Sequence, residues 1–282
     1  MPIRPTVYLG LWSRLTEAPV HLFCWLRHPA TVAERNVRNV VIDSVGVGLT
    51  AGIGSFLPVF LLRLGAGDFL IGLLTAMPAL TGMFLSIPIG QFLSRQRQIV
   101  PWFSYSRFTV LSCYALTGLV PFVFRTHRAE AIIAIWAVAT LPQTVVSVTF
   151  TVVMGGVAGP RGRFYLMSRR WSILGATNAI TALLVGQVLE LMPFPINYQV
   201  VFLAATVGGV ISVYFSSHIT LPDQEPVPSA PRSQPLRQRL FARSGEVVRN
   251  RPFLHFLIAQ FIFRWGLTLP VPLIPIYWVR VL

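Results

Sequence analysis

Among the ionisable residues inside long apolar stretches of the sequence, three stand out: Asp43, Arg107 and Arg264. Charged side chains at such positions are costly and usually functional. Asp43 lies about one turn into the first stretch and Arg107 about two turns into the third, so their depths differ by roughly 6 Å. An arginine side chain can span that difference. The sequence therefore predicts an Asp43–Arg107 ion pair. It would serve either as a proton or substrate switch in a cavity or as a structural gate near one membrane face.

Arg264 lies deeper, roughly 16 Å into the seventh apolar stretch. A fixed cation at that depth would suit the carboxylate or phosphate group of an anionic substrate; alternatively, it pairs with an acidic residue on another helix. Gln143, Asn178 and Gln187 are uncharged polar residues in the middle of apolar stretches. They are candidates either for lining a substrate pathway or for hydrogen bonds between neighbouring helices.

Motifs of enzymatic catalysis are absent from the sequence. It contains no HExxH, P-loop or GxSxG pattern, and its five histidines are scattered. Cys24 and Cys113 have no CxxC partner and are interpreted as packing residues. We therefore expect neither enzymatic activity nor a metal or cofactor.

The composition indicates a membrane protein. Of the 282 residues, 54% are hydrophobic and only 11% are charged, whereas a soluble domain carries about 25% charged residues. The net charge of +14 does not indicate nucleic acid, because the basic residues, all arginine, fall in short clusters between apolar runs instead of on one soluble module. The expected partner of the apolar surface is the lipid bilayer.

Seven stretches are long enough to cross a hydrocarbon core, which takes about 20 apolar residues. Because they are continuous rather than alternating, they predict helices and an all-α integral membrane fold. Proline and glycine within them are interpreted as kink and packing sites. The expected spans are Asn39–Leu62, Phe69–Leu93, Ile99–Phe124, Ala131–Val153, Trp171–Leu191, Ile196–Ile219 and Phe253–Val279.

The distribution of arginine predicts the orientation. Seventeen arginines precede the first span or lie in the loops on that same side, and four lie in the opposite loops. Arg169 and Arg170 belong to the larger set, at the edge of the loop before the fifth span. Because cytoplasmic loops are enriched in arginine, we expect a multi-pass protein of the cell (inner) membrane with a cytoplasmic N-terminus.

The chain divides into four parts: a cytoplasmic N-terminal segment (1–38), a six-helix transmembrane half (39–219), a cytoplasmic linker rich in proline and arginine (220–251), and a seventh helix (252–282). The seventh helix resembles the first. Both contain Gly-Leu-Thr and end in a proline, four apolar residues and an arginine, at Pro58–Arg63 and Pro275–Arg280. Internal repeats of this kind are common in transporters.

This arrangement resembles the major facilitator superfamily. The family's motif between its second and third helices is roughly G-x-L-a-D-r-x-g-r-r, and this chain has Gly90, Arg95 and Arg97 at or near matching places, with Ser94 where the family has Asp. Gly162-Arg163-Phe164-Tyr165 followed by Arg169 or Arg170, at the start of the fifth span, is also similar to bacterial facilitator sequences.

The resemblance implies secondary active transport of a small solute by alternating access. It also implies a twelve-helix fold, of which this chain would supply the first half and the beginning of the second, as part of a longer protein. The expected partners are an anionic or other small substrate, protons, and the remaining transporter helices or a second copy. The alternatives are a non-transporting truncated remnant, or a membrane enzyme or lipid-handling protein.

Overall fold

A computed structural model describes residues 29–223 and 250–280. Most of the expected N-terminal segment and linker lie outside these ranges. Within them the chain is helical, and seven helices are long and apolar enough to cross a membrane, which confirms the expected number of spans and gives a multi-pass architecture. The helices are α3 (Val32–Gly54), α4 (Leu57–Arg63), α5 (Asp68–Leu93), α6 (Val100–Val123), α7 (Arg128–Leu191), α8 (Ile196–Ser217), α10 (Arg251–Thr268) and α11 (Leu273–Arg280).

The first span begins earlier than expected and is broken near its end. Thr31 and Glu34 form a capping box, in which the Thr31 hydroxyl accepts from the Glu34 amide at 3.2 Å and the Glu34 carboxylate accepts from the Thr31 amide at 3.3 Å. This pair starts α3 at Val32 rather than Asn39, because it satisfies amides that the first helical turn leaves free. The chain breaks after Gly54 and resumes as α4, whose first turn contains Pro58.

The fourth and fifth spans form one long helical element with a kink, instead of two helices joined by a loop. The kink lies at Gly159, whose φ of 65° is non-helical and is a conformation that glycine adopts more readily than other residues. The two spans run over Arg128–Gly159 and Gly162–Leu191. The expected boundaries at Val153 and Trp171 are therefore wrong, and Arg163, Arg169 and Arg170 belong to a helix.

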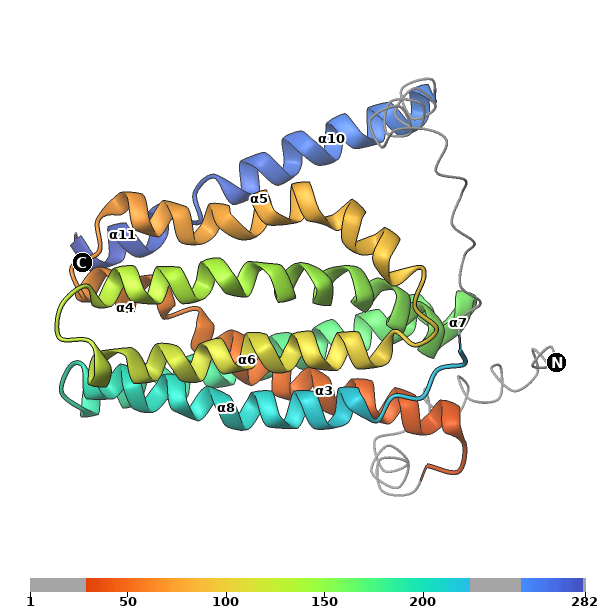
Figure 1. The fold of residues 1–282 in the computed structure, drawn as a ribbon, viewed down its shortest axis with the longest axis horizontal. Helices are drawn as coiled ribbons and strands as arrows, with labels where there is room; N and C mark the ends of the chain where they lie inside the picture. The colour runs from red at the N-terminus through yellow and green to blue at the C-terminus, as the bar shows by residue number, and fades with distance from the viewer. Residues whose placement is uncertain (1–28, 224–249, 281–282) are drawn as a thin grey trace.

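The helices of the first six spans form a bundle in which successive spans run in alternating directions (Figure 1). Helix α3 packs against α7 and α8, and α6 packs against the same two helices. The start of α3, the turn between α5 and α6, the kink of α7 and the end of α8 all lie at one end of the bundle. We call this the arginine-rich end, since Arg35, Arg38, Arg95, Arg97 and Arg163 lie there.

Two hydrophobic clusters fill the bundle. The larger includes Phe60, Tyr198 and Phe202, and the Phe60 and Tyr198 rings stack with centroids 4.8 Å apart. The smaller, which includes Phe103 and Met154, joins α3, α6 and α7. The candidate site lies beside this second cluster.

The seventh span repeats the construction of the first. Helix α10 is followed by a turn and then by the short helix α11, just as α3 is followed by α4. The two short helices carry the two repeated segments, and α11 packs against α4. No residue of α10 is buried within the described chain.

Candidate functional site

Asp43 lies at the centre of a buried charge cluster in the bundle. Its side chain is 1% exposed and forms ion pairs with two arginines, Arg107 and Arg170. Arg107 contacts Asp43 Oδ1, and Arg170 donates to Asp43 Oδ2 over 2.6 Å. The contact expected between Asp43 and Arg107 is therefore present, with a second arginine added to it.

Two serines complete the cluster. Ser212 on α8 accepts from Arg107 at 2.6 Å and donates to Asp43 at 2.7 Å, so it bridges the pair. Ser44 accepts from Arg170 at 3.2 Å. Both carboxylate oxygens and both arginines thus have partners, as a charge in a low-dielectric interior requires.

Four spans position the cluster. Asp43 and Ser44 come from α3, Arg107 from α6, Arg170 from the second half of α7, and Ser212 from α8. Each guanidinium lies over an aromatic ring, Arg107 over Phe103 at 4.5 Å and Arg170 over Phe150 at 4.9 Å. A ring face supports a cation without neutralising it. The cluster therefore holds the four spans together and carries two positive charges against one negative charge.

A cavity of about 210 Å³ borders the cluster. Arg107 and Ser212 form part of its wall, together with Thr50, Tyr114 and Gln143. The Arg107 side chain is 10% exposed, whereas that of Arg170 is 3% exposed. The surplus positive charge thus reaches the cavity through Arg107, and hydroxyl and amide groups lie around it.

The other expected pathway residues lie apart from the cluster or at its edge. Gln143 lines the cavity, but Asn178 is only partly buried in the second half of α7, and Gln187 is exposed. Arg264 is exposed on α10. The structure therefore brings together Asp43, Arg107 and Gln143, and leaves Asn178, Gln187 and Arg264 outside this site.

The residues that resemble the facilitator loop motif lie at the arginine-rich end. Gly90 is in the last turn of α5, and a methyl group added there would contact nothing within 4 Å. Ser94 caps the helix, and its hydroxyl donates to the Gln91 carbonyl at 2.9 Å. Arg95 and Arg97 are exposed. Ser94 thus stabilises its own turn.

Arg170 is the residue that the sequence analysis placed wrongly. Counting apolar residues assigned it to a loop edge, whereas the structure buries it in the cluster. Moving Arg170 out of the loop set leaves the arginine bias of the loops in the same direction.

Comparison of the chain with protein-family models, curated proteins and solved structures found no match.

Proposed function

We propose that the chain is part of a secondary transporter of the major facilitator type that moves a small anionic solute by alternating access. The observation that carries this proposal is the surplus positive charge of the Asp43–Arg107–Arg170 cluster at the wall of the 210 Å³ cavity. A buried cation without a full complement of counter-charge favours an anion. None of the described residues that line the cavity is acidic, and this supports the same class of substrate.

Asp43 gives Arg107 a resting partner. When no solute is bound, Arg107 is neutralised by the carboxylate; a solute carboxylate or phosphate would compete for the same guanidinium. Arg170 continues to hold Asp43 during that exchange, because it contacts the other carboxylate oxygen. When Arg107 exchanges Asp43 for the solute, α6 loses its ion pair with α3. A contact that is either made or broken in this way is what alternating access needs.

The repeat supports the facilitator architecture. Parallel repeats related by an axis along the membrane normal are one way in which transporters are built. Here the first and seventh spans share a sequence pattern and a helix–break–short helix construction, and their short helices pack together. Under this proposal, the remaining helices of the second half, or a second copy of the chain, cover α10.

The test is saturable uptake of anions by the protein isolated in its native assembly and reconstituted into proteoliposomes. We expect uptake and counterflow of a small carboxylate or of phosphate. Arg107→Gln should raise the half-saturating concentration at least about tenfold, because a charge-assisted hydrogen bond to the solute is lost. Arg125→Gln, which removes the same charge from an exposed loop residue, is the matched control. Uptake that is unchanged by Arg107→Gln, or confined to cations, would refute the proposal.

A further inference from the structure

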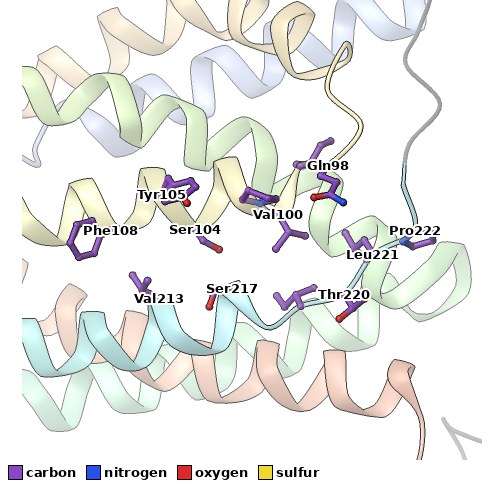
Figure 2. A pocket seen from close by; sticks show the side chains of 13 residues that line it. Gln98, Val100, Ser104, Tyr105, Phe108, Val213, Ser217, Thr220, Leu221 and Pro222 are labelled. Carbon is purple, nitrogen blue, oxygen red and sulfur yellow. The ribbon is translucent and has the colours of Figure 1, made fainter.

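A second and larger hollow lies between α6 and α8, with a volume of about 640 Å³. Figure 2 shows its lining side chains: Phe108 and Val213 lie at one end, and Gln98 and Pro222 lie at the other, towards the arginine-rich end. We call it the α6–α8 groove. Val213 lines both this groove and the cavity beside Arg107. None of the described residues that line the groove is charged, and most of them are apolar.

The groove runs along the axis of α6. From Val100 to Phe108 that helix rises about 12 Å, which is close to the depth of one leaflet of a hydrocarbon core about 30 Å thick. Tyr105 and Phe108 on its wall are 72% and 56% exposed. The groove is therefore open towards the surface of a membrane-spanning bundle, and its length matches a chain within one leaflet.

One polar group in the groove lacks a partner. Ser104 is buried, with only 8% of its surface exposed. Its hydroxyl nevertheless has no hydrogen-bond partner within the described chain. Thr109, Ser112 and Thr117 of the same helix each donate to the carbonyl four residues earlier. The Ser104 hydroxyl instead points into the gap between α6 and α8 (Figure 2). A buried hydroxyl without a partner is unfavourable, so a ligand acceptor at this position would remove that cost.

The polar end of the groove adjoins positive charge. Gln98 lies in the turn that carries the exposed Arg95 and Arg97. One acidic residue is also there, since Gln98 donates to Asp223 at 3.2 Å. Among the described residues of the turn and of its contact, two arginines against one aspartate give this end a positive charge.

We propose that the α6–α8 groove binds a phospholipid of the leaflet at the arginine-rich end. One acyl chain lies between Phe108 and Val213, an ester carbonyl accepts a hydrogen bond from Ser104, and the phosphate faces the turn that carries Arg95 and Arg97. An amphiphile fits because one end of the groove is apolar at bilayer depth and the other is polar and cationic. This site does not depend on the transport proposal.

Photolabelling tests the site directly. The purified, delipidated chain is incubated with phosphatidylglycerol that carries a diazirine on one acyl chain, illuminated, and digested for mass spectrometry. We expect at least about fivefold more label on Tyr105–Phe108 than on Phe122 and Val123, which are also exposed at the far end of α6. Excess unlabelled phosphatidylglycerol should remove the difference. Even labelling along α6 would overturn the proposal.

Two variants and one competitor identify the occupant. Ser104→Ala should weaken lipid binding about fivefold, as expected for one lost hydrogen bond. It should not lower the melting temperature of the delipidated protein, and should raise it slightly, because the variant has no unpartnered buried hydroxyl. Ser217→Trp, which fills the groove from its exposed edge, should abolish the selective label. Ser112→Ala is the matched control. If dodecyl maltoside competes as well as phosphatidylglycerol, or if Ser104→Ala binds lipid like the unaltered chain, the phospholipid assignment is wrong.

Discussion

The Asp43 carboxylate balances two arginines that would otherwise repel each other inside the bundle. Its two oxygens are divided between them, and Ser212 and Ser44 hold the geometry. Removing one partner from a buried ion pair usually costs more than the pair contributes, because an uncompensated charge stays behind. Substitutions of the three charged residues should therefore differ sharply in how far they lower the free energy of unfolding.

We expect Asp43→Asn to be the most damaging substitution in the cluster, with a loss of about 3–5 kcal/mol in the free energy of unfolding. It leaves two buried arginines without an acid. Arg107→Gln should cost less, because a neutral Asp43–Arg170 pair remains. The double variant should lie between them: it relieves the repulsion between the arginines but leaves Arg170 unpaired. Denaturant titration in mixed micelles measures all three, and additive losses would argue against a coupled cluster.

At the scale of helices, α3 and α8 lie close together at a pair of glycines, Gly46 and Gly208. A methyl group added to Gly46 would lie 2.4 Å from the Gly208 carbonyl oxygen, and one added to Gly208 would lie 2.9 Å from the Gly46 carbonyl oxygen. Both obstacles are backbone atoms, which cannot turn away. Small residues at such crossings let membrane helices pack tightly. This crossing lies one turn from Asp43 and Ser212, so it sets the separation of two elements that build the cluster.

Gly46→Ala should therefore force α3 and α8 apart and lower the free energy of unfolding by roughly 1–3 kcal/mol. Gly175→Ala is the matched control, because an added methyl group there has no neighbour within 4 Å. It should leave stability unchanged or raise it by about 0.5–1 kcal/mol, since alanine is the better helix former. Thermal unfolding of both variants in the same detergent provides the comparison. Equal behaviour of the two would show that the helices are not limited by this contact.

The sequence predicted the helices better than it predicted their joints. Hydropathy is a local property, so the seven spans could be predicted from it. The helical rise per residue then gave the depths of Asp43 and Arg107, and these depths were enough to predict their contact. The continuous path of α7 through Gly159 depends on one glycine dihedral that residue types do not reveal. Arg170 was missed for a related reason: its burial follows from how α7 packs against α3, which is not encoded in any local pattern.

At the scale of the whole molecule, the seventh span stands apart from the others. Helix α10 buries nothing within the described chain, and Arg264 lies on it, exposed, about 20 Å from the helix start. That depth falls within the hydrocarbon core. Lipid can cover the apolar residues of α10, but a charged side chain facing lipid costs about 2.5–3.5 kcal/mol on insertion scales. This cost is the physical reason to expect a further helix, with an acidic or polar residue, against Arg264.

Arg264 should therefore limit insertion of the seventh span when the chain is made alone. In a translation system with microsomes, a glycosylation acceptor placed after Val279 reports whether the end of that span reaches the lumen, which the arginine bias predicts. Arg264→Leu should raise the glycosylated fraction strongly, because it removes a charge from the core. Arg251→Leu, at the membrane edge where α10 begins, should change it little. Full glycosylation of the unaltered chain would show that the membrane already accommodates Arg264. If the Arg264→Leu variant is not glycosylated at all, the N-terminus lies on the other side of the membrane.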